Sequence, residues 1–455
     1  MENLELNHFK AFADKISWSD IQRKNVLLYG ENGAGKSSLF DALKYVFYKD
    51  EIEKVDALLP LLDQQAHVDA VRESYKNHQS VLPFSVKFNG TDLYSLDTSS
   101  YQVFMLRRFN QTNQITLRNV LSGSFLPKNV ETFMAENYSF VIKNVNEELA
   151  RSFLEPREIS VADEHDGYLI AVRNIETGLS RSQDLRSSFN EAIINLIQLL
   201  IWFTTVQLMF DSTKRKIVVL DDFITSLDAA NRALIMHFIL ANFSEEQLVI
   251  FTHDYSLFNI TSYIIRYVES VESKWKRYKL YVTSQGHTLM QVMRIRVQCL
   301  QDEYNNPACN YEVLGNKIRK CFEQLLHDLS VELSIGTLEE TKNIIDRIAN
   351  NETVYWKSDS NLQELITRIE KIIPSISDTS VRNKLLNLIG QYKLKKANKL
   401  KDTICSLKLY QKITMHPLSH GVLGVVHFSK KDVRQSLILL EQLEKCVYSI
   451  EDGKI

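Results

Sequence analysis

The chain has 455 residues, of which 44% are hydrophobic and 24% are charged, and its formal net charge is −2. These values exclude an intrinsically disordered or uniformly basic chain, and the length is sufficient for two or three domains. The five cysteines form no Cys-x-x-Cys pair, which argues against a zinc hook or a disulfide framework and predicts a cytoplasmic protein.

The amino-terminal segment 1–5 lacks the basic and apolar regions of a signal peptide, so we expect no secretion leader. Residues 4–9 alternate between apolar and polar side chains, which predicts a β-strand. A polar turn at 23–25 then leads into the apolar run 26–29. We expect this run to be a buried strand.

A glycine-rich segment follows that strand. Residues 30–37 read Gly-Glu-Asn-Gly-Ala-Gly-Lys-Ser, the phosphate-binding loop pattern that joins a buried strand to a helix. Backbone N–H groups of such a loop point at phosphates, and the helix adds its positive N-terminal end. Lys36 should therefore reach the β- and γ-phosphates of a nucleotide, and the Ser37 hydroxyl should bind Mg²⁺. The predicted nucleotide-binding residues are Gly30, Asn32, Gly33, Ala34, Gly35, Lys36, Ser37 and Ser38.

The segment between this loop and Ser188 contains no sustained heptad repeat, which argues against a long coiled-coil arm. Residues 81–106 contain short strand-like runs, the last of which is 102–106. Gln111 follows that run and is a candidate lid glutamine that touches Mg²⁺. A solvated loop glutamine is the alternative interpretation.

A long apolar helix is predicted to begin near residue 188. Ser188 and Glu191 form a Ser-x-x-Glu capping box, which would place the helix N-terminus there. A capped, exposed helix N-terminus can bind phosphate. The apolar stretch 192–210 is interrupted by asparagine and glutamine residues, so we expect a buried helix rather than a membrane span.

Two acidic residues end the next apolar run, 216–220, which predicts a central parallel strand whose carboxyl end faces a ligand. Asp221 would hold Mg²⁺, directly or through water, and Asp222 would polarise the attacking water. The alternative is a helix-capping pair of aspartates. A further apolar strand, 247–251, precedes His253, which could hydrogen-bond the γ-phosphate or the water, or could be purely structural.

The order of these motifs resembles that of an ATP-binding-cassette ATPase of the SMC and RecF kind over about residues 1–265. The matching segments are 30–37, 220–222, 226–228 and 252–254, which correspond to the family's Walker A, Walker B, D-loop and switch histidine. The resemblance implies ATP and Mg²⁺ as cofactors and a nucleotide contact by Asp228. It also implies a homodimer or higher homo-oligomer in which two chains enclose two ATP molecules.

The sequence departs from the family at two positions. Residues 187–191 stand where the family has Leu-Ser-Gly-Gly-Gln/Glu, and we take Ser188 as the signature serine that contacts phosphate. Ser180, in a segment of similar letters, is the alternative. Asp222 stands where the family usually has glutamate. This shorter acid predicts slow ATP turnover.

The sequence predicts a domain boundary near 301–307, and hence domains 1–300 and 301–455. The second domain is helical by period, with three apolar faces. The predicted faces are Ile318, Phe322, Leu325, Leu326 and Leu329; Leu362, Leu365, Ile366, Ile369 and Ile372; and Leu437, Leu439, Leu440, Leu443 and Val447. The lysine-rich run 393–401 is a solvated helix face or, alternatively, a nucleic-acid or partner patch.

Three residues of the second domain could carry chemistry. Arg319 and Glu323 share one helix face, and His420 follows near the carboxyl end. The trio resembles the active site of bacterial anticodon nucleases. We prefer a structural ion pair and a structurally hydrogen-bonded histidine, because such pairs are common on helices.

Together these features predict an α/β fold: an ABC-type P-loop ATPase domain, with a mixed sheet and a helical subdomain, followed by a helical C-terminal domain. The compact architecture resembles the AAA-type ATPase subunits of bacterial anti-phage systems, and in particular the Septu ATPase. That resemblance implies an ATPase that senses nucleotide state and controls a partner HNH nuclease, with nucleic-acid contact through the complex and no membrane. The alternatives are an ATP-controlled ribonuclease that uses Arg319, Glu323 and His420, and a RecF-like DNA-repair ATPase.

Overall fold

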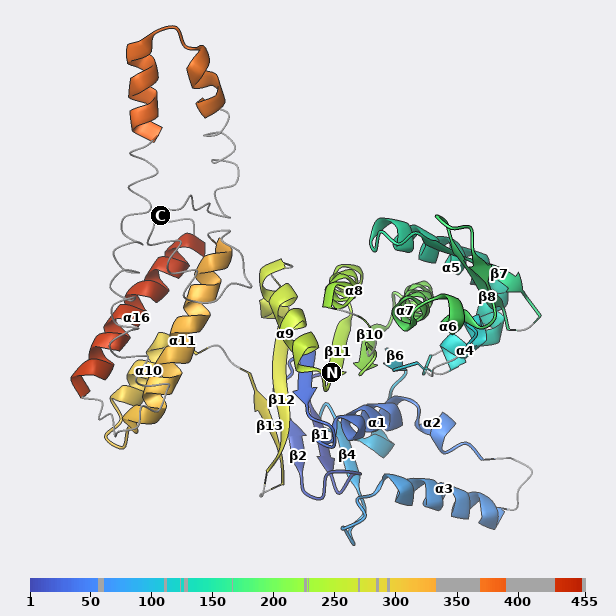
Figure 1. The fold of residues 1–455 in the computed structure, drawn as a ribbon. Helices are drawn as coiled ribbons and strands as arrows, with labels where there is room; N and C mark the ends of the chain where they lie inside the picture. The colour runs from blue at the N-terminus through green and yellow to red at the C-terminus, as the bar shows by residue number, and fades with distance from the viewer. Residues whose placement is uncertain are drawn as a thin grey trace. The chain divides into compact units, whose positions relative to one another are not determined.

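The computed structural model describes thirteen segments of the chain: 1–55, 61–109, 113–122, 124–126, 130–165, 167–224, 227, 229–268, 271–283, 286–292, 295–332, 369–389 and 430–451. The chain divides into two compact units, Met1–Val292 and Met293–Ile455 (Figure 1). Helix α10 (Val297–Tyr304) lies in the second unit, whereas the sequence placed the boundary after residue 300. The reason is packing: Val297 and Leu300 belong to the second unit's hydrophobic core.

A six-stranded sheet forms the centre of the first unit, in the order β13-β12-β3-β11-β10-β6. Its strands are β3 (Asn25–Gly30), β6 (Tyr101–Arg107), β10 (Arg215–Asp221), β11 (Gln247–Thr252), β12 (Trp275–Thr283) and β13 (Gly286–Gln291). All neighbouring pairs from β12 to β6 are parallel, and β13 pairs antiparallel with β12. Because parallel strands end at one edge, the segments after β3, β6, β10 and β11 meet there.

Two smaller antiparallel sheets complete the strands of the first unit. One has the order β2-β1-β4-β5 and the other the order β7-β8-β9. The bounds are β1 (Leu4–Asn7), β2 (Ile16–Trp18), β4 (Ser85–Phe88), β5 (Thr91–Asp92), β7 (Arg157–Asp163), β8 (Leu169–Asn174) and β9 (Ser180–Arg181).

Nine α-helices, two 3-10 helices (η1 and η3) and one π-helix (η2) are described in the first unit. They are α1 (Lys36–Phe47), α2 (Lys49–Ile52), α3 (Leu61–Tyr75), α4 (Leu117–Ser122), α5 (Val130–Arg151), α6 (Leu185–Ser188), α7 (Glu191–Leu208), α8 (Ala229–Asn242), α9 (Tyr255–Tyr263), η1 (Leu93–Ser95), η2 (Ile264–Val268) and η3 (Glu272–Lys274). Helix α5 packs on α7 and β7.

The central sheet separates two hydrophobic cores. Successive residues of a strand point to opposite faces, so Val26 and Leu28 join the core that contains α1, whereas Leu27 joins the core that contains α7. Strands β6, β10 and β11 alternate in the same way. The continuous apolar sequences of these strands are therefore explained by burial on both faces.

Helix α7 is long and apolar enough to cross a membrane, and no other helix of the described segments passes that test of length and composition. Most of its residues between Ile193 and Val206 are buried in the core of the first unit. A helix that is apolar on all sides is expected in such a core. The predicted buried helix is confirmed.

The second unit has a core built by α10, α11 (Tyr311–Glu332) and α16 (Lys430–Glu451). The buried residues are Val297, Leu300, Leu314, Ile318, Cys321, Phe322, Leu325, Leu326, Val433, Leu437, Leu440 and Leu443. They include most of the first and third apolar faces that the sequence predicts. A short helix, η5 (Ile373–Ser375), and the helical segment 379–389 are also described. Most of the second face and the whole lysine run 393–401 lie outside the described residues.

Candidate functional site

The phosphate-loop pattern joins β3 to α1 at the carboxyl edge of the central sheet. Gly33 (φ 83°) and Gly35 (φ 99°) adopt left-handed backbone conformations that favour glycine. Gly35 caps α1, and a Cβ placed there would lie 2.9 Å from the Phe12 ring, so a side chain is excluded for two reasons. The loop residues Asn32 and Gly33, and Ser37 in the first turn of α1, are exposed. The loop therefore presents an accessible turn beside a helix N-terminus.

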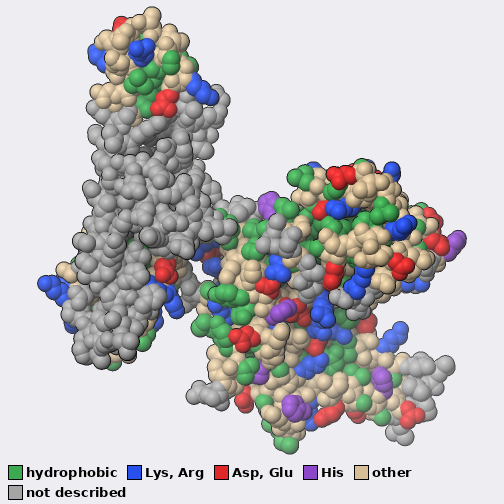
Figure 2. Space-filling model, viewed as in Figure 1, with side chains coloured by type: hydrophobic (Ala, Val, Ile, Leu, Met, Phe, Trp, Pro, Cys, Tyr) green, Lys and Arg blue, Asp and Glu red, His purple; other side chains and the backbone are tan. Residues whose placement is uncertain are grey.

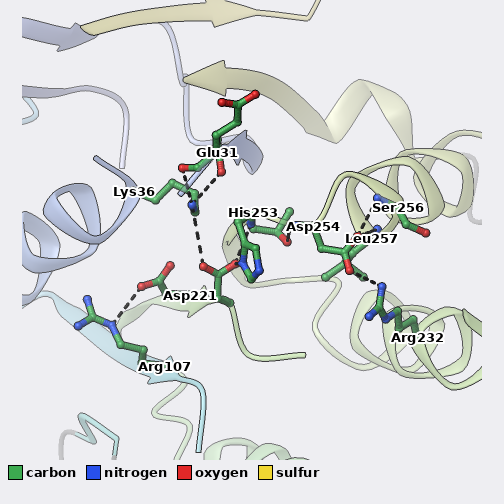
Figure 3. A network of polar contacts seen from close by, with 12 residues as sticks. Glu31, Lys36, Arg107, Asp221, Arg232, His253, Asp254, Ser256 and Leu257 are labelled. Carbon is green, nitrogen blue, oxygen red and sulfur yellow. Dashed lines mark hydrogen bonds and ion pairs between the residues drawn. The ribbon is translucent and has the colours of Figure 1, made fainter. Parts of the chain in front are cut away.

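Lys36 is buried and turned back onto its own loop. Its Nζ donates to the carbonyl oxygens of Gly30 (2.8 Å) and Glu31 (3.2 Å), and lies 4.0 Å from Asp222 Oδ2 (Figure 3). Burial lowers the pKa of Lys36, while the nearby carboxyl groups of Asp222 and Asp221 oppose that shift. The ammonium group is thus held by carbonyl dipoles next to two acids.

Asp222 and His253 form one hydrogen-bonded pair. Asp222 Oδ1 accepts from the backbone N–H of His253 (2.7 Å) and lies 2.8 Å from His253 Nδ1. The parallel pairing of β10 with β11 places the two strand ends together. Asp222 has a φ of 47°, an uncommon conformation for a residue other than glycine. Both predicted chemical residues therefore lie together at the strand ends, beside Lys36.

Asp221 lies one residue earlier and is almost fully buried, with 2% of its surface exposed. Burial raises its pKa to about 6, although the Arg107 guanidinium beside it acts in the opposite direction. Arg107 Nε donates to Asp221 Oδ2 at 3.1 Å. This carboxyl group is thus buried beside one cationic partner.

Sequence reasoning missed Arg107. It ends β6 and stands directly opposite Asp221 in the parallel ladder with β10. Its guanidinium also bonds Asp41 of α1 (3.1 Å) and lies 4.5 Å from the Phe40 ring, while Lys10 pairs with the same Asp41. The sequence signal that could have identified Arg107 is its position as a cation at the end of an apolar strand. Arg107 thus links the Asp221 strand end to the helix that follows the phosphate loop.

The residues present fit Mg²⁺. Asp221 Oδ1 is buried and has no hydrogen-bond partner among the described residues, so one hard oxygen is free for a cation. Ser37 lies in the first turn of α1, at the end of the phosphate loop. No group of three or more His, Cys, Asp or Glu side chains in the described segments could hold a metal ion alone. Mg²⁺ commonly completes its shell with water and phosphate oxygens, which agrees with so few protein ligands.

A second ion pair, also missed from the sequence, braces the end of β11. Asp254 caps α9 by accepting from the N–H groups of Ser256 (2.8 Å) and Leu257 (3.1 Å), and it pairs with Arg232 of α8. Arg232 Nε also donates to the carbonyl of Leu227 at 2.7 Å. Arg232 thereby connects the residue before Asp228 to the His253 segment. Ser226 and Asp228 themselves lie outside the described residues, as does Gln111.

The predicted capping box at Ser188 and Glu191 is wrong. Asn190 caps α7, and its side-chain oxygen accepts from the N–H of Ile193 at 2.9 Å. Ser188 ends the short helix α6, because Phe189 is extended (φ −130°, ψ 145°) and only 7% exposed. Burying that phenylalanine interrupts the helix and moves the α7 N-terminus to Glu191.

Three further predicted residues can be placed. Ser188 is partly exposed, two residues before the cap of α7. Ser180, the alternative, begins the exposed strand β9. Ser38 is buried, and its hydroxyl accepts from the Ala11 N–H at 3.2 Å. Ser38 therefore connects the phosphate loop to the segment after β1, and its nucleotide contact stays a prediction.

The possible ribonuclease trio is described only in part. Arg319 Nε lies 3.7 Å from Glu323 Oε1 within α11, which is the i,i+4 ion pair that the sequence predicts. His420 lies outside the described residues. No convergence of the three groups is therefore described, and their catalytic role stays a prediction.

Comparisons with solved structures return SMC head domains. A SmcHead bound to the C-winged helix domain of ScpA has 12% identity and a TM-score of 0.38, covering 64% of this chain and 97% of that one. The SMC head domain from Thermotoga maritima has 14% identity and a TM-score of 0.36, covering 64% and 98%. An Smc head with an extended coiled coil, bound to the C-terminal domain of ScpA from Pyrococcus furiosus, has 11% identity and a TM-score of 0.38, covering 67% and 99%.

No curated protein matches the chain. A family profile described as "AAA domain" matches residues 3–445, which is nearly the whole chain and includes parts of both units. The phosphate loop and the acidic strand end lie where such an ATPase requires them. The chain belongs to the AAA domain family of P-loop ATPases.

Proposed function

We propose that this protein binds ATP at the carboxyl edge of its central sheet and hydrolyses it slowly. The observation that carries the proposal is the meeting of Lys36, Asp222 and His253 beside a left-handed glycine loop, with Lys36 Nζ 4.0 Å from Asp222 Oδ2. Cation, acid and histidine are the residue types that hold a phosphate chain and orient a water.

Lys36 supplies the cation for the β- and γ-phosphates. Its present acceptors are the carbonyl oxygens of Gly30 and Glu31, which are weaker partners than phosphate oxygens. A bound phosphate therefore competes favourably for the ammonium group. Asp221 and Ser37 are the residues that would hold Mg²⁺, which neutralises developing charge on the phosphates.

Asp222 accepts a proton from the attacking water or orients it, and His253 positions Asp222. Two donors of His253 converge on Asp222 Oδ1, so Oδ2 is the oxygen that faces Lys36. An aspartate held in this way cannot advance toward the nucleotide as a glutamate could. Because small misplacements of a catalytic group reduce rates strongly, we expect slow turnover.

In the proposed assembly, two chains enclose two ATP molecules. Ser188 and the N-terminus of α7 would face the phosphate loop of the partner chain, as the resemblance to ATP-binding-cassette ATPases implies. Support within the chain is that Ser188 is partly exposed and precedes a capped helix N-terminus. The D-loop residue Asp228 would lie at the same interface.

We further propose that the ATP-loaded protein controls a separate HNH nuclease in an anti-phage complex in the cytoplasm, and reaches nucleic acid through that complex. The support is the sequence resemblance to the Septu ATPase. In this proposal the helical second unit acts by contact, because Arg319 and Glu323 already pair with each other.

The ATPase proposal is tested with the purified full chain. ATP affinity is measured by calorimetry with Mg²⁺, turnover by phosphate release, and dimer formation by light scattering with and without ATP. We expect ATP-dependent dimers in the wild type and in Ser180→Arg, and ATP-bound monomers in Ser188→Arg. Dimers of Ser188→Arg together with monomers of Ser180→Arg would show that Ser180 is the signature serine.

The nuclease proposal has a separate test. The chain alone is incubated with transfer RNA, single-stranded RNA and DNA, with and without ATP, and then with a co-expressed HNH nuclease. Cleavage only in the presence of the second protein supports the proposal. Cleavage by the chain alone that disappears in both Glu323→Gln and His420→Ala would establish the ribonuclease alternative instead.

A further inference from the structure

A second candidate site lies at the amino edge of the central sheet, where β3, β10 and β11 begin. Residues at these strand starts line a cleft of about 510 Å³, which we call the amino-end cleft. Its cationic lining residues are Arg23, Lys24, Lys214, Arg215, Lys216 and Lys274, and its acidic ones are Glu245 and Glu246. The cleft is thus strongly cationic, although the whole chain has a net charge of −2.

The side chains at the floor of the cleft are polar, and they already have hydrogen-bond or ion-pair partners within the protein. Gln247 is buried and donates to the carbonyl of Lys24 at 2.8 Å, while buried Asn25 accepts from the N–H of Leu248 at 2.9 Å. Glu246, also buried, pairs with Lys216 at 3.7 Å. These contacts tie β3, β10 and β11 together at their starts. The cations other than Lys216 therefore lie around a floor that is held in place by these contacts.

Four of the cations have no carboxylate partner within the described part of the chain. Arg23 pairs with Glu2, but among the described residues no ion pair joins Lys24, Lys214, Arg215 or Lys274 to an acid. Like charges gathered in one cleft repel one another and create a positive potential that attracts anions. On the face drawn in Figure 2, by contrast, basic and acidic side chains of the first unit are interspersed.

We propose that the amino-end cleft binds a chain of closely spaced phosphates, as in a nucleoside polyphosphate. Its volume falls in the usual range for small-molecule sites, about 300–1,000 Å³. The partly buried ring of Tyr101 also lines it, with the Arg215 guanidinium 5.9 Å from the ring centre, and these flat groups suit a nucleobase.

This site is separate from the phosphate loop and does not rest on the proposed ATPase activity. Strand β3 runs from Asn25 in the cleft to Gly30 at the loop. At the usual rise per residue, the two sites are roughly 17 Å apart. One chain could therefore bind two phosphate ligands at once.

The test uses inorganic tripolyphosphate as the probe and calorimetry on the full chain. The background variant Lys36→Ala removes the loop lysine, so that binding at the cleft is measured by itself. We expect about one tripolyphosphate per chain in this background, and weaker binding as salt rises. Adding Lys24→Ala and Arg215→Ala should weaken the affinity by about a hundredfold, since each lost charged contact costs roughly tenfold.

The matched control adds Lys143→Ala and Arg151→Ala, which remove one lysine and one arginine from the exposed surface of α5. It should bind tripolyphosphate as the background does. Arg215→Lys keeps the charge and should also preserve binding, which separates the loss of charge from a loss of folding. Thermal unfolding checks every variant.

Two results would overturn the proposal. One is an affinity that the cleft variants leave unchanged or an absence of binding in the folded background. The other is a single-stranded oligonucleotide that displaces tripolyphosphate, depends on Lys24 and Arg215, and binds far more tightly than adenosine tetraphosphate. That second result would assign the cleft to nucleic-acid phosphates instead of a small molecule.

Discussion

The two edges of the central sheet carry opposite kinds of site. At the carboxyl edge, Lys36 and Arg107 both have protein acceptors: Lys36 bonds two carbonyls, and Arg107 pairs with two acids. At the amino edge, four cations line the cleft without an ion pair to any acid of the described residues, although Glu245 and Glu246 also line it. These two positive charges at the carboxyl edge are therefore already bound by protein groups, whereas the four at the amino edge are available to bind an anionic ligand.

This difference follows from how parallel strands end. At the carboxyl edge the strands open into glycine turns and helix N-termini, so backbone N–H groups can bind phosphate and side chains are free for chemistry. At the amino edge no glycine is among the described residues that line the cleft, so we expect side chains to hold an anion there. The first arrangement suits catalysis and the second suits binding alone.

The largest expected effect is on turnover at the carboxyl edge. Asp222→Asn should reduce ATP hydrolysis by about a hundredfold to ten-thousandfold, because the group that accepts or orients the water's proton is lost. ATP binding should persist. Phosphate release in single-turnover experiments measures the effect, and the double variant of the amino-end cleft should hydrolyse ATP like the wild type.

Asp222→Glu should raise the rate of ATP hydrolysis, measured in the same way. A lower rate would mean that the site is shaped around aspartate.

The next effect is on affinity. Lys36→Ala should weaken ATP binding at the loop by about a hundredfold or more, because a buried charge-assisted contact to phosphate is removed. Calorimetry with Mg²⁺ measures it, with Lys143→Ala as the exposed control. Unchanged affinity and turnover in Lys36→Ala would exclude this loop as the catalytic nucleotide site.

Comparing the stability of the wild type with that of Asp221→Asn at different pH values should reveal the free-energy cost of burying the Asp221 charge. Burial raises the pKa of Asp221 to about 6 from an ordinary 3.8, so the folded wild type holds a proton that the unfolded chain has lost. Wild-type stability should therefore fall relative to Asp221→Asn as pH rises from about 4 to about 6, by about 2–3 kcal/mol, and stay constant above. Denaturant unfolding across this range measures the difference.

Asp254→Asn serves as a control, because the pH dependence of stability that we expect at this position has the opposite sign. Burial acts to raise the pKa of Asp254, but the helix-capping N–H groups and Arg232 outweigh it and hold the pKa below its usual value. Relative to Asp254→Asn, the wild type should therefore lose stability as pH falls through the lowered pKa. A pH-independent difference between the wild type and Asp221→Asn would contradict the assigned burial of that charge.

The smallest effect is expected at Arg107. Its guanidinium neutralises Asp221 and would repel Mg²⁺ beside the same carboxylate. Arg107→Met should therefore tighten Mg²⁺ binding in the presence of ATP by about tenfold or less, since the arginine is partly exposed and its pairs are worth on the order of 1 kcal/mol. Mn²⁺ titration followed by electron paramagnetic resonance measures the change. Weaker binding would mean that Arg107 organises the metal site.

Short-range chemistry made much of the fold and of the site predictable. The phosphate loop was recognisable because Gly33 and Gly35 need left-handed backbone and because their spacing from Lys36 is local. The strand ending in Asp221 was recognisable because a strand buried on both faces must be apolar along its length. The buried helix α7 and the apolar faces of α11 and α16 followed from the same pattern of burial.

The start of α7 was not predictable from local rules. Ser188 and Glu191 satisfy the spacing of a capping box, yet Asn190 makes the cap. Local propensity cannot show that Phe189 is drawn into the core and breaks the helix there. Packing of one aromatic ring outweighed a capping pattern worth about 1 kcal/mol.

The remaining features depend on contacts between residues far apart in the chain. The order of the motifs was enough to indicate a nucleotide site and its residue types. Arg107 meets Asp221 only because β6 and β10 pair in parallel in one particular register. The cations of the amino-end cleft meet only because β3 and β10 begin at the same edge as η3. Such long-range contacts depend on the packing of the whole sheet, so no short stretch of sequence can predict them.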